Sequence, residues 1–274
     1  MPSVNRKVLP GFTLALGYST FYLSVLVLLP IAACFTKTFS LSFDEFWAAV
    51  WTERTRAAYL LTFGAALVAA AADLFLGLLI AWVLVRYKFP FKRLLDSLID
   101  LPLALPTAVA GLVYASLYVP TGWFGQFLSP LGIEAAYSRL AIVMVLTFIG
   151  IPFVVRTVQP VLEELDVEVE EAAASLGAGR WQIFRHVILP ALYPALVTGF
   201  ALAFARALGE YGSVVFVSGN MPYRTEIAPV LIVARLEEFA YGEATAIAVV
   251  LLVISFSMLF LINILERWSR RHDA

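Results

Sequence analysis

Long apolar stretches constrain this chain more than any other feature. A helix that crosses a bilayer needs about 20 mostly apolar residues. Six stretches meet that requirement: residues 12–35, 58–85, 97–119, 140–158, 191–217 and 243–265. Hydrophobic residues make up 61% of the chain and charged residues 14%, whereas a soluble domain has about 45–50% and about 25%. The sequence therefore predicts an all-α integral membrane protein with six spanning helices.

The start of the chain has features of a signal peptide, because Arg6 and Lys7 precede the first apolar stretch. That stretch exceeds the roughly 7–15 apolar residues of a signal peptide, and no clean cleavage site follows it. We therefore expect an uncleaved first span. Cys34, the single cysteine, excludes an internal disulfide framework. His186 and His272 are the two histidines, so we predict no histidine-rich metal site.

Lysine and arginine residues predict the orientation, because cytoplasmic loops carry an excess of them. One set of connections holds twelve: Arg6, Lys7, Arg86, Lys88, Lys92, Arg93, Arg156, Arg180, Arg185, Arg267, Arg270 and Arg271. The opposite set holds six: Lys37, Arg54, Arg56, Arg139, Arg224 and Arg235. The first set is predicted to face the cytoplasm, with both termini inside. We find no low-complexity segment or internal repeat, and expect one membrane domain over residues 1–274.

The connection between the fourth and fifth spans, residues 161–190, has a helical pattern of its own. Apolar residues recur every three or four positions, which marks one face of a helix: Leu162, Leu165, Val169, Ala172 and Leu176. The other faces are acidic: Glu163, Glu164, Asp166, Glu168, Glu170 and Glu171. Gly177 and Gly179 are predicted to end this helix.

A second short helix is predicted to follow, with Trp181, Phe184 and Ile188 on one side. Pro190 is expected to open the next span, where its missing N–H costs nothing. An amphipathic helix can lie on the membrane or dock into a groove on a partner protein. Because cytoplasmic leaflets are anionic, the acidic faces favour the partner.

The motif within this connection resembles the cytoplasmic signature of ABC-importer permeases. "EAAASLG" is followed nine residues later by "VILP". The matching positions are Glu171, Ala172, Ala173, Gly177, Val187, Leu189 and Pro190. Val187 departs from the usual isoleucine. In that family the loop is the coupling helix, which sits in a groove of the ATP-hydrolysing subunit and transmits its closing motion to the spans.

Further segments extend the resemblance over nearly the whole chain. Together they resemble the sulfate/thiosulfate transporter permease family: "VLPGFTLALG", "RYKFP", "DLPLALPTAVAGL", "IPFVVRTVQPVLEEL", "EEAAASLGA", "RALGEYG" and "RLEEF". "DLPLALPT" and "RALGEYG" are also similar to molybdate and related oxyanion permeases. The resemblance implies sulfate import by alternating access, with thiosulfate as a further substrate and molybdate or tungstate as the nearest alternative.

The resemblance also implies partners for this chain in the bacterial cytoplasmic (inner) membrane. They are a homologous second permease, two ATP-binding subunits and a periplasmic sulfate/thiosulfate-binding protein. No glycine-rich phosphate loop of the Walker type is present, so we expect no bound ATP, no cofactor and no catalytic residue in this chain. The net charge of −1 gives no reason to expect nucleic acid as a partner.

Two charges lie inside the fifth stretch. Arg206, Glu210 and Ser213 are spaced i, i+4 and i+7, so one helix would place them on one face. Charges inside a membrane usually pair and face a bundle interior or a wet cavity. Either Arg206 attracts the oxyanion, or Arg206 and Glu210 neutralise each other and fix the packing or a gate. Small residues at positions 199, 203 and 207 form a neighbouring stripe that permits close helix packing.

Other polar or helix-breaking residues are candidates for the pathway. Pro102 and Pro106 should kink or interrupt the third stretch, with Thr107 as a polar contact. Freed carbonyls at that depth are tolerated only where they are buried or line a cavity. Asp73 in the second stretch is expected to face a cavity or to hydrogen-bond between helices. A proton-coupling role is its alternative.

Two connections, residues 218–226 and 234–239, are predicted to face the periplasm. They are candidates for docking the binding protein, with ordinary solvated loops as the alternative. A proton- or sodium-driven secondary transporter would need more carboxylates in the spans, and it gives no reason for the acidic helix. A membrane enzyme would need a metal cluster or a Ser/His nucleophile, which the spans lack.

Overall fold

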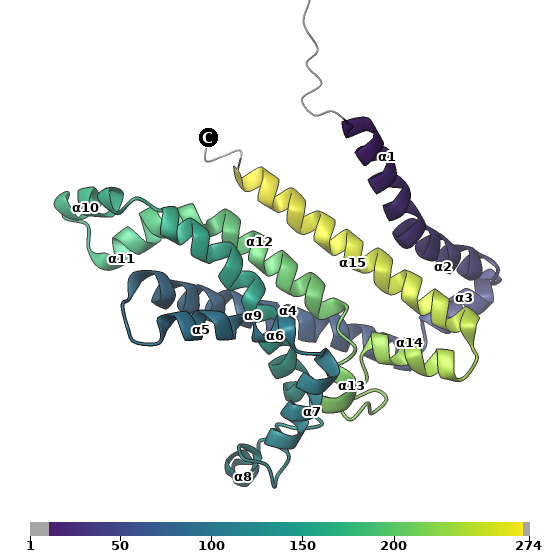
Figure 1. Ribbon diagram of the computed structural model, residues 1–274. Coiled ribbons are helices and arrows are strands. Elements are labelled where there is room, and N and C mark those ends of the chain that lie inside the picture. Colours follow the sequence, from purple (N-terminus) through teal and green to yellow (C-terminus); the bar gives the residue numbers. More distant parts are fainter. Residues whose placement is uncertain (1–10, 271–274) are drawn as a thin grey trace, which may run out of the picture.

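The computed structural model describes residues 11–270, and every regular element in that range is helical (Figure 1). The first half contains α1 (Phe12–Leu23), the π-helical η1 (Ser24–Leu28), α2 (Leu29–Phe39), α3 (Phe43–Val50), α4 (Glu53–Arg86), α5 (Lys92–Ile99), α6 (Leu101–Ala104), α7 (Thr107–Tyr118), α8 (Gly125–Leu128) and the 3-10 turn η2 (Ser129–Leu131). The second half contains α9 (Arg139–Glu164), α10 (Val167–Ser175), α11 (Arg180–Ile183), the π-helical η3 (Phe184–Ile188), α12 (Leu189–Leu208), α13 (Val214–Val217), α14 (Ala228–Glu237) and α15 (Tyr241–Arg270).

The core forms where α4, α9 and α12 pack against one another. Small residues on these helices permit the close approach. A Cβ atom built at Gly199 of α12 would lie 3.0 Å from Cα of Val154 in α9. Ala203 and Ala207, on the same side of α12, are buried. The predicted stripe of small residues at 199, 203 and 207 is therefore confirmed as a packing face.

Within residues 11–270, five helices are long and apolar enough to cross a membrane: Phe12–Phe39, Glu53–Arg86, Arg139–Glu164, Arg180–Leu208 and Tyr241–Ile262. The predicted all-helical class is confirmed, but the third predicted span, residues 97–119, is not among these five helices. That stretch contains the end of α5, then α6 and α7. Leu105 is extended at ψ 136° and Pro106 precedes α7, because the residue before a proline is disfavoured in the α region.

The fifth predicted span is also wrong at its end. The sequence predicts one stretch over 191–217, whereas α12 ends at Leu208 and α13 begins only at Val214. Gly209 and Gly212 lie in this interruption, and glycine disfavours helix continuation because of its backbone freedom. The helix also begins earlier than predicted, since Arg180–Leu208 is continuous.

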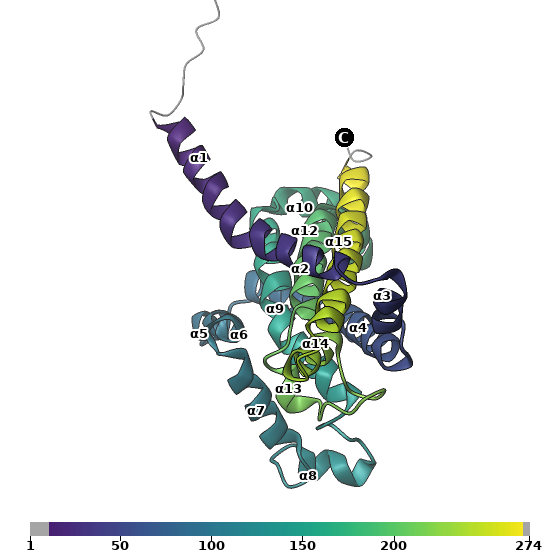
Figure 2. The ribbon, with the colours of Figure 1, turned by 90° about the vertical axis from the view of Figure 1, so that its right-hand side faces the viewer.

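The first span lies at the side of the molecule. Helix α1 projects away from the core in both views, and α2 continues it along α15 (Figures 1 and 2). None of the described residues of α1 or η1 is buried. The predicted cytoplasmic position of the termini, with Arg6, Lys7 and Arg271, falls outside the described residues and stays a prediction.

Candidate functional site

Helix α10 occupies the connection that carries the signature motif. Its start is set by Asp166, whose side chain accepts a hydrogen bond of 3.0 Å from the backbone N–H of Glu168. Its end is set by Gly177 at φ +88°, where glycine avoids the strain of the left-handed region. Ala178 N–H then donates to the Ala173 carbonyl at 3.1 Å, which closes a Schellman-type C-cap. The predicted glycine turn at Gly177 is confirmed.

The predicted single apolar face over this connection is wrong. Leu162 is buried in α9, and the chain breaks at Leu165, which is extended at ψ 120°. Because Asp166 caps a new helix, Val169 and Leu176 belong to a separate element. Both are exposed, Leu176 to 89%. Val169 and Leu176 therefore leave apolar surface uncovered within the described part of the chain.

The remaining signature residues lie in and after α10. Glu171 and Ala172 are exposed and Ala173 is half-buried. Val187 and Leu189 are half-buried. Pro190 does not open a span, contrary to prediction, because α11, η3 and α12 form one helix from Arg180. The wider π-helical turn Phe184–Ile188 precedes Pro190 and belongs to this continuous helix.

Arg206, Glu210 and Ser213 come together, but not on one helix as predicted. Because α12 ends at Leu208, Glu210 and Ser213 follow its C-terminus. Arg206 Nη1 lies 2.6 Å from Glu210 Oε2. The backbone N–H and the hydroxyl of Ser213 each donate to Glu210 Oε1 at 2.9 Å. The carboxylate, 2% exposed, is thus engaged at both oxygens, while Arg206 is 33% exposed.

This interruption packs against the start of α7. A Cβ atom at Gly212 would lie 2.2 Å from Thr107 Oγ1, and one at Gly111 would lie 2.2 Å from the Ser213 carbonyl oxygen. The interruption at Pro106 and the one after Leu208 therefore meet. Irregular backbone at membrane depth occurs where it is buried or lines a cavity. Thr107 thus lies beside Gly212, the chain neighbour of Ser213.

Pro102 and Pro106 lie in different environments. Pro106 is exposed, and its interruption of the helix is confirmed. Pro102 is buried within the first turn of α6, where proline is tolerated. It lines an apolar groove of about 400 Å³ with residues of α4, α5 and α9. The structure does not bring Pro102 to the charged pair.

Asp73 lies where α4 contacts α9. The side chain is buried, and a Cβ atom at Gly150 would lie 1.8 Å from Asp73 Oδ2. The side chain thus lies between two helices, but the predicted interhelical hydrogen bond is not seen at Oδ1, which has no partner among the described residues. No group of three or more His, Cys, Asp or Glu side chains suited to a metal ion occurs in the described range.

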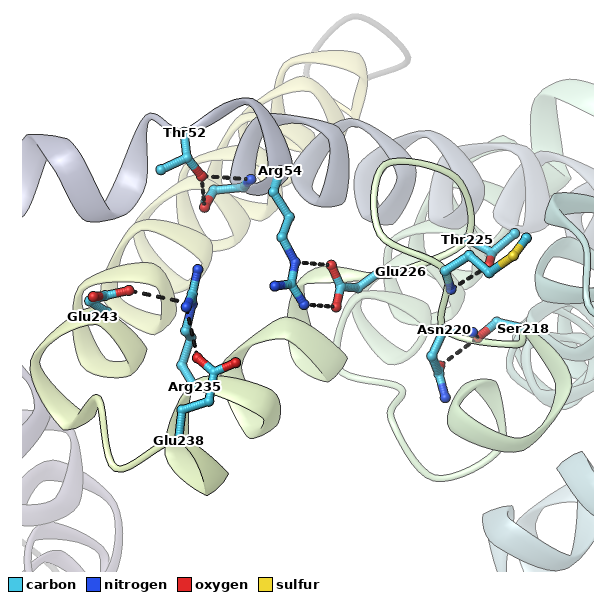
Figure 3. Close-up of polar contacts among 11 residues, drawn as sticks. Thr52, Arg54, Ser218, Asn220, Thr225, Glu226, Arg235, Glu238 and Glu243 are labelled. Atoms are coloured by element: carbon cyan, nitrogen blue, oxygen red, sulfur yellow. Dashed lines mark hydrogen bonds and ion pairs between the residues drawn. The ribbon is translucent and has the colours of Figure 1, made fainter.

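Ion pairs join the connections that are predicted to face the periplasm (Figure 3). Arg54 Nε and Nη2 donate to the two carboxylate oxygens of Glu226 at 2.8 and 2.7 Å. Arg235 of α14 lies 2.7 Å from Glu238 and 3.4 Å from Glu243. The buried Glu226 ties residues 218–226 to α4. Residues 234–239 are mostly the last turn of α14, which Arg235 joins to α15.

Two further ion-pair groups escaped the sequence analysis. Arg156 of α9 donates to Asp96 at 2.7 Å and, through two nitrogens, to Asp100 at 2.7 and 2.9 Å. Arg86 donates to Glu170 of α10. The only sequence signal is a charge close to the end of an apolar stretch. The partner lies 56 to 84 residues away, so spacing cannot identify it.

The chain matches a protein-family model described as the inner membrane component of binding-protein-dependent transport systems, over residues 73–271. The sulfate transport system permease protein CysT of Salmonella typhimurium is 50% identical over 268 residues, covering 97% of both chains. The CysT protein of Escherichia coli is 49% identical with the same coverage. That of Synechococcus elongatus is 48% identical, covering 100% of this chain and 99% of the relative.

Solved structures of ABC transporters share the fold. A transporter involved in the import of the acidic polysaccharide alginate has a TM-score of 0.76 at 16% identity, covering 93% of this chain and 94% of that chain. The MetNI methionine transporter has a TM-score of 0.57 at 19% identity, covering 84% and 99%. The chain belongs to the family of binding-protein-dependent transport system inner membrane components.

Proposed function

We propose that this chain is the permease subunit of an ATP-driven importer that moves sulfate across the bacterial cytoplasmic membrane. The observation that carries the substrate is near full-length identity of 48–50% to sulfate permeases of three bacteria. The chain is a transport subunit and not an enzyme, and ATP hydrolysis belongs to a separate subunit. Thiosulfate is a further candidate substrate, and molybdate or tungstate is the nearest alternative.

The proposed mechanism is alternating access between two arrangements of the packed helices, selected by nucleotide on the ATPase. Residues 161–190 act as the coupling loop, with Glu171, Ala172, Ala173, Gly177, Val187, Leu189 and Pro190 as its signature. The exposed Val169 and Leu176 support this role, because an amphipathic helix anchors in a groove through such side chains. Both termini are cytoplasmic in this proposal, and residues 1–274 form one membrane domain.

The proposed partners are two ATP-binding subunits, a homologous second permease and a periplasmic sulfate/thiosulfate-binding protein. The described α1 and η1 have no buried residue, so their apolar surface is available to bilayer lipid and to a second permease. The connections 218–226 and 234–239 are proposed to receive the binding protein. Their ion pairs to α4 and α15 would pass docking forces into the helices.

The polar cluster of Arg206, Glu210, Ser213 and Thr107 is proposed to gate the pathway. Glu210 is engaged at both oxygens, so it neutralises Arg206 and fixes the interruption after α12. The partial exposure of Arg206 leaves nitrogens for a transient contact with sulfate. A weak site suits a conduit, because the ion must leave again.

Reconstitution tests this proposal. The complete transporter in proteoliposomes, with its binding protein on one side and ATP on the other, should accumulate labelled sulfate. Uptake should stop without ATP and persist with a protonophore. Sulfate uptake by this chain without ATP-binding subunits, driven by a proton or sodium gradient, would instead establish a secondary transporter. Accumulation of molybdate but not sulfate would replace sulfate as the proposed substrate and would leave the proposed ATP-driven mechanism unchanged.

A further inference from the structure

One contact joins α10 to a core helix far away in the sequence. Arg86, the last residue of α4, donates through Nη2 to Glu170 of α10 across 84 positions. Both side chains are about one-fifth exposed, so water screens this pair less than it would a fully exposed one. Glu170 is the acid of α10 that is paired within the described residues, whereas Glu168 and Glu171 are exposed.

Arg86 also contacts an aromatic side chain of its own helix. Its guanidinium carbon lies 5.6 Å from the ring centre of Trp82, one helical turn earlier, within the range of a cation–π contact. Trp82 meets Phe184 edge to face at 5.8 Å, and Phe184 stacks on Trp181 at 5.4 Å. The contact therefore runs from α10 through Arg86 and Trp82 to the helix that begins at Arg180.

Helix α10 has little else to hold it. None of its nine residues is buried in the described structure, and irregular backbone lies on both sides, at Leu165–Asp166 and at Leu176–Gly179. In contrast, α4 packs along α9 and α12 through buried residues over most of its length. A side-chain link between α10 and α4 is therefore a direct route into the core.

We propose that Arg86 and Glu170 are positioning residues that hold α10 against the cytoplasmic end of α4, so that movement of α10 displaces α4 as well as its flanking helices. The inference rests on the proposed function, since it takes α10 to be the segment that follows the ATPase. In this proposal Glu170 holds α10 in place within this chain, whereas Glu168 and Glu171 face the ATPase partner.

Charge exchange in the complete transporter tests the pair. Arg86→Glu and Glu170→Arg should each lower the sulfate transported per ATP hydrolysed by about fivefold, the factor that corresponds to losing about 1 kcal/mol. The double variant R86E/E170R should regain most of that ratio, because the ion pair re-forms with reversed sign. Lys88→Glu is the matched control, since Lys88 is exposed and belongs to none of the ion pairs of the described residues.

Membrane level and copurified ATPase are measured for each variant, so that loss of folding is separated from loss of coupling. If a reversal is lost from the membrane, Glu170→Gln and Arg86→Lys replace it, with lowered coupling expected for the first and near-normal coupling for the second. Wild-type coupling in the single variants, or no recovery in the double variant, would overturn the proposal. If wild type moved molybdate instead of sulfate, the proposed substrate would fail, and the same ratio measured with molybdate would still test the pair.

Discussion

At the scale of the residue, Glu210 shows how a buried charge is accommodated just after the end of a candidate spanning helix. Its oxygens take Arg206 on one side and Ser213 on the other, so the buried carboxylate has both a countercharge and hydrogen-bond donors. Removing one partner of a buried ion pair is costly, because the other charge remains without compensation. The pair is thus sensitive whether or not Arg206 meets the substrate.

Arg206→Gln should abolish most sulfate uptake while the protein stays in the membrane. The substitution leaves Glu210 buried without its countercharge, a change that costs about 3 kcal/mol or more in folded proteins. Labelled sulfate uptake, normalised to membrane level, measures the effect. Arg56→Gln is the control, because Arg56 is exposed and belongs to none of the ion pairs of the described residues. Normal uptake by Arg206→Gln would remove both the gating and the substrate-contact role.

Asp73→Asn should transport sulfate at close to the wild-type rate. Asparagine has nearly the shape of aspartate and fits the space against Gly150, where Oδ1 has no hydrogen-bond partner among the described residues. Sulfate uptake with and without a protonophore measures the effect. Loss of uptake at a normal membrane level would support the alternative in which Asp73 carries a coupled proton.

At the scale of the element, the sequence predicts where helices lie better than where they stop. Apolar length located five spans, and the prolines located the interruption before α7. The interruption after Leu208 was missed, because Gly209 and Gly212 within an apolar stretch also fit a close-packed helix. Its cause is tertiary, since Gly212 and Ser213 must approach Thr107 and Gly111 of α7.

The ion pairs between distant parts of the chain were beyond sequence reasoning for a similar reason, whereas the pair of Arg206 and Glu210, four residues apart, was predicted. Arg86, Arg156 and Arg54 find their acids on helices that only the folded chain brings near. The coupling motif was identifiable because its residues are local and its glycine has a backbone requirement that φ +88° at Gly177 confirms. The glycine turn was predictable from local sequence, whereas the ion pairs between distant helices were not.

Gly177→Val should leave the chain in the membrane and abolish transport. A β-branched residue at a positive φ is strained, so the turn after α10 would shift and α10 would lose its orientation. Uptake and membrane level are measured together. Gly179→Ala is the matched control, because Gly179 has φ −73° and its added Cβ would meet Gln182 only at 3.7 Å. A Gly177→Val variant with normal ATP-driven uptake would refute the required turn.

Gly111→Val should destabilise the contact between α7 and α13. An added Cβ would lie 2.2 Å from the Ser213 carbonyl oxygen, and overpacking of this kind costs about 1–3 kcal/mol. Thermal unfolding of the purified complex should therefore shift to lower temperature. Gly64→Val on α4 is the control, since no atom lies within 4 Å of its added Cβ. Equal unfolding temperatures for the two variants would contradict the close approach.

At the scale of the whole molecule, the chain is built as one part of an assembly. Its core lies between α4, α9 and α12, while α1 projects from it without a buried residue in the described range (Figure 2). The exposed apolar residues of α10 lie at another end of the molecule (Figure 1). The proposed partners are separate chains. This sequence alone could therefore predict their number and identity only through its family resemblance.

Uptake of labelled sulfate and labelled molybdate tests the central claim most directly. The measurement uses cells that lack this chain, with and without its restoration, in a background without redundant sulfate transporters. The account predicts that sulfate uptake is lost without the chain and returns with it, while molybdate uptake is unchanged. Unchanged sulfate uptake in the absence of the chain would contradict the proposed substrate, and loss of molybdate uptake alone would assign the pathway to the other anion.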